Sequence, residues 1–264
     1  MRVGSVCTQP PYNDKNVPYL KSTACELSEA LRNLTLKLYS DHLSEDGKTV
    51  DYKAMSRSLC FERYCDLAVQ LQRVELLSLS REEKLAFFAS GGNVKCSQFL
   101  CIWSVVLQFF NYVSYFIGGE VFTLQDIENG VLRGNRKGVA QLHEVALPDV
   151  EPLIHFALNC GAKGCPSIKT YTPQDIDSQL CSAAEAFLEN DDSCGIDSVG
   201  REVKLSQIFK WYKADFGGTD EKLLNWVFDH MGASQKKRTL QALLSEGKVK
   251  VSYLPYDWSI NSTD

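Results

Sequence analysis

The stretch "LIHFALNCGAKGCPSIKTYTPQDIDSQLCSAAEAFLEN", residues 153–190, decides the fold class because it holds clear signals of two kinds. Residues 153–159 are an apolar run of the length of a buried strand. A turn rich in glycine and cysteine follows and ends before Pro166. A helix is then predicted with Thr172 as its N-cap, Pro173 in the first helical position and apolar residues on one face. The stretch therefore predicts a strand, a tight turn and an amphipathic helix in succession.

The sequence on either side continues this mixture of helices and short strands. Hairpins are expected at "YFIGGEVFTL" (residues 115–124) and "IDSVGREVKL" (residues 196–205), because glycine lies between the two extended runs of each. Helices are predicted at about 205–215, 220–231 and 235–246, and alternating valines predict a strand near the end of the chain. The predicted fold class is α+β, with helices packed around a small, mostly antiparallel sheet.

The chain divides into a tail, a helical lead-in and a main domain. Residues 1–20 are rich in proline and asparagine and are expected to be an N-terminal tail. Leucines at helical spacing predict helices over residues 21–75. Residues 76–262 carry the mixed pattern and are expected to form the main domain.

Charge and cysteine content limit the classes of function. The 33 acidic and 28 basic side chains give a net charge of -5, so no strong positive field is present to hold a nucleic acid. Ten cysteines in 264 residues fall well below the density of a disulfide scaffold, and the N-terminus lacks the apolar core of a signal peptide. We therefore expect a cytoplasmic protein, in which thiols serve packing, metal binding or chemistry.

One segment raises the question of a membrane. Residues 96–119 carry no charged side chain, and residues 99–117 are about long enough for a transmembrane helix. Gln108 and Asn111 interrupt the apolar run. We expect a buried core element, and no membrane contact unless residues 99–117 form a true span.

The glycine-rich turn is the candidate functional site, because it holds Cys160 and Cys165. Cys160 could be a catalytic nucleophile with His155 as its base, although strand alternation would put these two side chains on opposite faces. His143, expected at the surface, is the other candidate base. A reversible disulfide between Cys160 and Cys165 and simple packing of both thiols around a tight turn remain open alternatives. Four residues separate the cysteines, which does not fit the usual zinc pairs, so no metal site is predicted.

Five further residues have polar or aromatic side chains of interest. Arg133 and Arg136 in "LRGNR" could bind an anion near a helix end, or belong to the turn that ends that helix. Trp211 and Tyr212 are expected to fill the core. Asp257 is expected to cap the last strand rather than to orient a histidine.

Four stretches together carry a family resemblance: "FTLQDIENGVLRGNR" (122–136), "IHFALNCGAKGCPSI" (154–168), "FKWYKADFGG" (209–218) and "YLPYDWSIN" (253–261). This combination resembles the uncharacterised family called domain of unknown function 547, over most of residues 70–260. In some animal proteins of the family the domain accompanies glutaredoxin-like or DEP domains, which implies a regulatory or redox-linked setting. The glutaredoxin C-x-x-C pair itself does not occur in this sequence.

The sequence departs from the family pattern after "EKLAFF". The family continues there with a helix of the form I-N-x-Y-N-A-L, whereas residues 89–110 read "ASGGNVKCSQFLCIWSVVLQFF". We hypothesise that residues 89–110 are a replaced segment, for example retained intron sequence.

The sequence thus favours a thiol-dependent hydrolase- or transferase-like site centred on Cys160, with His155 or His143 as base. A non-catalytic protein-interaction or regulatory module is one alternative, and a thiol–disulfide redox domain is another. No cofactor is predicted, and the expected partner is another protein.

Overall fold

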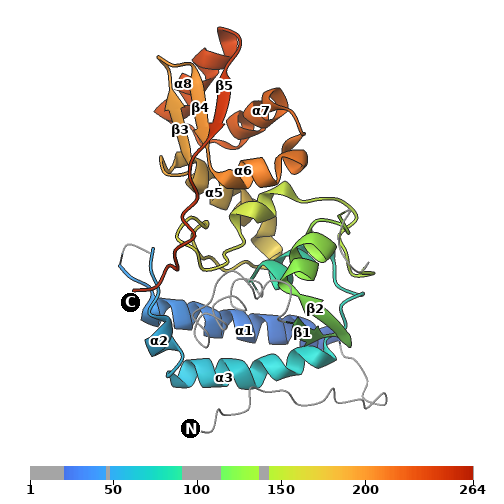
Figure 1. Cartoon of the computed structure of the whole chain (residues 1–264). Coiled ribbons are helices and arrows are strands. Elements are labelled where there is room, and N and C mark those ends of the chain that lie inside the picture. The colour runs from blue at the N-terminus through green and yellow to red at the C-terminus, as the bar shows by residue number, and fades with distance from the viewer. Residues whose placement is uncertain (1–20, 46–47, 91–113, 137–142, 264) are drawn as a thin grey trace.

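The computed structural model describes residues 21–45, 48–90, 114–136 and 143–263 (Figure 1). Helices α1 (Lys21–His42), α2 (Tyr52–Met55) and α3 (Leu59–Ala68) form one end of the molecule. The sheet of β3 (Cys194–Asp197), β4 (Glu202–Leu205) and β5 (Lys250–Tyr253) forms the opposite end. The segments that carry the candidate site lie between these two ends.

The helical lead-in shares a hydrophobic core with the segment that follows it. Ser58 caps α3 by accepting a hydrogen bond from Phe61 N–H, and the 3-10 helix η1 (Val69–Arg73) continues its path. A further helix covers residues 81–90, where Ser80 and Glu83 form a reciprocal capping box. The shared core contains buried side chains from the lead-in and from later segments, among them Leu31, Tyr64, Phe88, Ile127 and Tyr171.

The first predicted hairpin is confirmed. Strands β1 (Ser114–Ile117) and β2 (Glu120–Thr123) pair antiparallel, and Gly118 and Gly119 make the turn with positive φ. A π-helix, η3 (Asp126–Leu132), follows directly, and Asp126 ties it to β2 by accepting from Thr123. Gly134, with φ 62°, lies in the turn that ends it.

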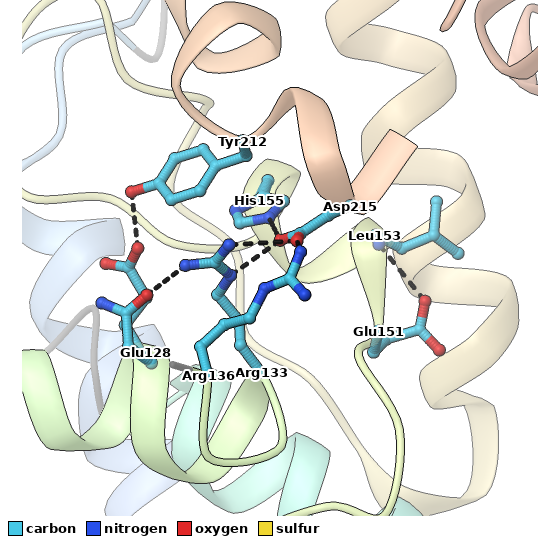
Figure 2. Close-up of polar contacts among 9 residues, drawn as sticks. Glu128, Arg133, Arg136, Glu151, Leu153, His155, Tyr212 and Asp215 are labelled. Carbon is cyan, nitrogen blue, oxygen red and sulfur yellow. Dashed lines mark hydrogen bonds and ion pairs between the residues drawn. The ribbon is translucent and has the colours of Figure 1, made fainter. Parts of the chain in front are cut away.

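The strand predicted at residues 153–159 is wrong. Pro152 begins a 3-10 helix instead, η4 (Pro152–Phe156), and the carboxylate of Glu151 caps it by accepting from Leu153 N–H at 3.2 Å (Figure 2). A short apolar run has no period of its own, so it is compatible with a strand or a helical turn. Pro152 in the first helical position and Glu151 as the N-cap favour the helical turn. The strand alternation that would separate His155 from Cys160 therefore does not apply.

The C-terminal half follows the predicted order of elements. A 3-10 turn, η5 (Pro173–Asp175), leads into α5 (Ile176–Glu189), the amphipathic helix predicted after Thr172. Strands β3 and β4 form the second predicted hairpin, and β5 joins β4 in parallel. Around this sheet pack α6 (Gln207–Trp211), η6 (Lys213–Phe216), α7 (Asp220–His230) and α8 (Gln235–Ser245). The α+β class and the mostly antiparallel pairing are confirmed for the described residues.

The last residues of the chain run back from the sheet to the glycine-rich turn. Ala162 and Ile260 form an antiparallel bridge, and Gly164 N–H donates to the carbonyl of Asp257 at 3.0 Å. The carbonyl of Asn261 in turn accepts from Val50 N–H at 2.8 Å. The two stretches most typical of the family resemblance, around residues 160 and 257, are therefore neighbours in space.

Within the described ranges, no helix is both long and apolar enough to cross a membrane. Most of the apolar stretch 99–117, and all but two residues of the suspected replacement at 89–110, lie outside these ranges.

Candidate functional site

The turn that holds the two cysteines is closed by Asn159. Its side-chain amide donates to the carbonyl of Pro166 at 2.7 Å, and its amide oxygen accepts from Gly161 N–H at 2.7 Å. Gly161 has φ 86°, a conformation that a residue with a side chain rarely adopts. One buried asparagine thus joins both ends of the loop and turns Cys160 towards Cys165.

The two thiols are in direct contact. Cys160 Sγ lies 3.2 Å from Cys165 Sγ, and both residues are partly buried. Cys160 N–H donates to Cys165 Sγ at 3.3 Å, and the hydroxyl of Tyr256 lies 3.1 Å from the same sulfur. Three donors, counting the Cys160 thiol, can therefore converge on Cys165 Sγ.

This environment favours a thiolate at Cys165. The hydrogen bond from the Cys160 thiol lowers the pKa of Cys165, and those from Tyr256 and from the backbone N–H groups of Cys160 and Ala162 lower it further. Burial raises the pKa of Cys165, but the donors outweigh burial and leave it well below the ordinary range of a thiol. Burial, and then the neighbouring cysteines, raise the pKa of Tyr256, so its hydroxyl keeps the proton that it donates.

Tyr256 reaches the sulfur because residue 164 has no side chain. A Cβ at Gly164 would lie 2.9 Å from one carbon of the Tyr256 ring and 3.1 Å from Asp257 N. The ring also packs against Trp211 and Trp258, with centroids 4.9 and 4.6 Å away. Trp211 is 45% exposed, so the expectation that it fills the core is wrong.

A cleft of about 670 Å³ borders the loop on the side of α5 and the lead-in. Cys165, Asn159 and Lys163 line it, together with Lys48 from the lead-in and Phe187 from α5. The segment that contains Cys165 is therefore accessible from a cavity large enough for a small molecule or a peptide side chain.

A second polar cluster is built around the carboxylate of Asp215. Figure 2 shows both guanidinium groups and the His155 ring pointing towards it. Arg133 donates from Nε at 2.7 Å and from Nη2 at 3.0 Å, and Arg136 also donates to the carboxylate. The Asp215 side chain is fully buried. Burial raises the pKa of Asp215, but the hydrogen bonds from His155 and Arg133 outweigh burial and lower its pKa overall.

His155 belongs to this second cluster. Its Nε2 lies 2.9 Å from Asp215 Oδ2, and its ring stacks on Tyr212 with centroids 3.9 Å apart. The Tyr212 hydroxyl donates to Glu128 at 2.5 Å. Burial lowers the pKa of His155, and the hydrogen bond to Asp215 offsets this only in part, so the imidazole is held neutral. The structure thus brings His155 to Asp215, while the sulfur of Cys160 contacts Cys165.

His143 is buried, so the surface position expected for it is wrong. Its ring stacks on Phe122 and lies 3.5 Å from both Glu120 and Asp126. A Cβ at Gly130 would lie 2.7 Å from the ring, which shows how closely η3 packs on it. The described contacts of His143 therefore lie in the hairpin, in η3 and at Asn135 just after η3, rather than in the cysteine loop.

Arg133 and Arg136 lie close together, as an anion site would require. The anion they hold in the structure is the carboxylate of Asp215 from η6. Gly134 and Asn135 between them both have positive φ, so the turn that was the alternative is also present. Asp257 accepts from Ser259 N–H and Oγ in a local turn beyond the end of β5, so the expectation that it caps the last strand is wrong.

The remaining described cysteines have other environments. Cys194 is fully buried in β3, and burial raises its pKa to about 11. Burial also raises the pKa of Cys60, whereas Cys181 is exposed on α5. Among the residues that the structure describes, no three His, Cys, Asp or Glu side chains are grouped as metal ligands.

Sequence reasoning missed three residues that shape the site: Tyr256, Asp215 and Asn159. Asn159 directly precedes Cys160, but an asparagine in a turn has many local roles. Tyr256 and Asp215 lie in "YLPYDWSIN" and "FKWYKADFGG", two of the stretches that carry the family resemblance. That shared membership was the available signal that distant segments meet at the cysteine loop.

Comparison with known proteins confirms the family resemblance for the central part of the chain. Residues 76–188 match the model of a family described as "Protein of unknown function, DUF547". The match includes the cysteine loop, His155 and both arginines. Searches of curated proteins and of solved structures found no match.

Proposed function

Since residues 76–188 are a DUF547 segment with two thiols in contact, we propose that this protein is a thiol–disulfide redox protein whose reactive pair is Cys160 and Cys165. The observation that carries the proposal is the 3.2 Å approach of the two sulfurs, with three donors directed at one of them. A pair used only for packing has no need of a tyrosine hydroxyl on one of its sulfurs.

The reaction needs a disulfide R–S–S–R as co-reactant. The Cys165 thiolate attacks one of its sulfurs, the R–S–S–R bond breaks, and the first RS⁻ leaves and takes up a proton. The Cys160 thiol then loses its proton and attacks Cys165 Sγ. This forms the Cys160–Cys165 disulfide, releases the second RSH and completes the transfer of two electrons from the protein to the co-reactant.

Stabilisation of the Cys165 thiolate affects the reduction potential of the pair. A reduced form that is stabilised as a thiolate raises the reduction potential, so the disulfide is a better oxidant than an ordinary structural disulfide. We also propose that the protein is located in the cytoplasm, where the reducing conditions keep Cys160 and Cys165 as two thiols.

A Cys/His hydrolase- or transferase-like site is the second candidate. The hydrogen bond between His155 and Asp215 favours it, because carboxylates orient imidazole bases in this way. The redox proposal is stronger, since the donors at Cys165 include no imidazole and His155 Nε2 is committed to Asp215.

Alkylation with iodoacetamide across pH 5 to 10 tests the proposal. Trypsin cleaves after Lys163, so Cys160 and Cys165 fall on separate peptides, residues 138–163 and 164–169, with one cysteine each. We expect Cys165 to react fastest of all cysteines at neutral pH, with a midpoint well below the value of about 8.5 for a free thiol. Buried Cys194 is the internal control and should remain almost unlabelled.

The variants His155→Gln and Cys160→Ser separate the candidate functions. Under the redox proposal, His155→Gln leaves the alkylation midpoint of Cys165 unchanged, whereas Cys160→Ser shifts it and prevents intramolecular disulfide formation. A hydrolase-like site predicts the opposite, a loss of thiol reactivity in His155→Gln. Slow and uniform labelling of every cysteine would instead support the interaction module.

A further inference from the structure

Beside the thiol pair lies an exposed aromatic cluster made of Trp211, Tyr256 and Trp258. The three ring centroids are 4.6 to 5.4 Å apart. Trp211 is 45% exposed and Trp258 is 47% exposed, although aromatic rings of this size are mostly buried in folded proteins. Paired tryptophans at a surface are typical of the residues that dominate protein–protein binding energy.

The cluster is held firmly against the cysteine loop. Gln207 of α6 donates to the carbonyl of Leu254 at 2.8 Å, which ties the helix of Trp211 to the C-terminal segment. Lys163 N–H donates to the carbonyl of Ser259 at 2.9 Å, so the residue after Trp258 pairs with the loop itself. These two hydrogen bonds to backbone carbonyls therefore set the rings in a defined position relative to the sulfurs.

Tyr256 belongs to both the cluster and the thiol site. Its hydroxyl contacts Cys165 Sγ, while its ring contacts both tryptophans. A group bonded to Cys165 in a mixed disulfide therefore lies beside the Tyr256 hydroxyl, at the edge of the cluster. Apolar side chains on that group would cover the rings and remove their surface from water, whereas a small polar disulfide would leave them exposed.

We propose that the disulfide co-reactant is a polypeptide, and that the apolar residues flanking its cysteine dock on Trp211, Tyr256 and Trp258. This inference rests on the proposed function, because it names the substrate class of the same thiol pair. Rigid aromatic anchors beside a reactive sulfur give selectivity by contact with the neighbours of the substrate cysteine rather than with its disulfide.

Three disulfide probes test the inference with the full-length reduced protein. Two are short peptides in which the cysteine is flanked by phenylalanine or by serine, each bonded through its sulfur to 2-mercaptoethanol. The third is 2-hydroxyethyl disulfide. We expect the wild-type protein to react about threefold to tenfold faster with the phenylalanine peptide than with the serine peptide, as one or two aromatic contacts provide.

The variants Trp211→Ala and Trp258→Ala should lose this preference and keep the wild-type rate with 2-hydroxyethyl disulfide. Val199→Ala, which trims a 95% exposed apolar side chain outside the cluster, should keep both rates. Equal rates with the two peptides in the wild-type protein would overturn the inference alone. So would an equal slowing of all three probes in the tryptophan variants, because the rings would then only support the thiol site. Failure to react with 2-hydroxyethyl disulfide would refute the proposed function and the inference with it.

Discussion

Removing the hydroxyl of Tyr256 should weaken the thiolate at Cys165 without disturbing the packing around it. Tyr256→Phe keeps the ring that lies over Gly164 and packs on both tryptophans, and deletes only the donor 3.1 Å from Cys165 Sγ. A hydrogen bond to a charged group contributes about 1.5–3 kcal/mol. Because one pKa unit corresponds to about 1.4 kcal/mol, the pKa of Cys165 should rise by about 1–2 units in the variant.

The same loss should appear in the redox equilibrium. For a two-electron couple about 30 mV corresponds to 1.4 kcal/mol, so the potential of the Cys160–Cys165 pair should fall by up to about 30–60 mV. The pKa is read from the pH dependence of iodoacetamide labelling, and the potential from equilibration with dithiothreitol.

Tyr253→Phe is the matched control, since it removes the hydroxyl of a partly buried tyrosine in β5 whose ring faces Lys210 rather than the thiols. The reasoning is refuted if Tyr256→Phe and Tyr253→Phe leave the labelling midpoint of Cys165 equally unchanged.

Three further changes probe the packing and charge around the site. Gly164→Ala should lower the free energy of unfolding by about 1–3 kcal/mol in thermal unfolding and raise the labelling midpoint of Cys165, because the new Cβ would displace the Tyr256 ring. Gly195→Ala is the control and should do neither, because its Cβ would meet nothing closer than 3.9 Å. Asp215→Ala should cost about 3–5 kcal/mol in urea unfolding, because it leaves two arginines at a buried site without their shared carboxylate; a loss below 1 kcal/mol would show that solvent replaces it. Burial lowers the pKa of His155 in the folded state, so below about pH 6.5 the unfolded chain binds a proton at this histidine and the folded protein does not. The free energy of unfolding should therefore fall as the pH decreases, and His155→Gln should make it less dependent on pH in this range.

Local sequence signals predicted the elements whose ends are marked by glycine or proline. The hairpin at Gly118 and Gly119 and the helix after Thr172 are both present, because glycines with positive φ and a proline in the first helical turn act within a few residues. The strand predicted at residues 153–159 is wrong, because an apolar run without a period does not distinguish a buried strand from a buried helical turn.

Distance along the chain limited the prediction of the site. Tyr256 lies 91 residues from Cys165, and Asp215 lies 60 residues from His155. No local pattern encodes such pairings, since they depend on how α6 and the C-terminal segment return to the loop. A pairing of Cys160 with Cys165 was one alternative at the sequence level because both lie in one short turn, and in the structure their sulfurs are 3.2 Å apart.

The most direct test of the account is an equilibrium redox titration of the full-length protein in dithiothreitol buffers of defined potential. Acid quenching, alkylation and tryptic mass spectrometry would follow the disulfide that joins peptides 138–163 and 164–169. The account predicts one reversible two-electron transition in which Cys160 and Cys165 are lost together, at a potential above the value of about −300 mV typical of structural disulfides. Both thiols remaining free across the titration, or Cys165 pairing with a cysteine other than Cys160, would contradict it.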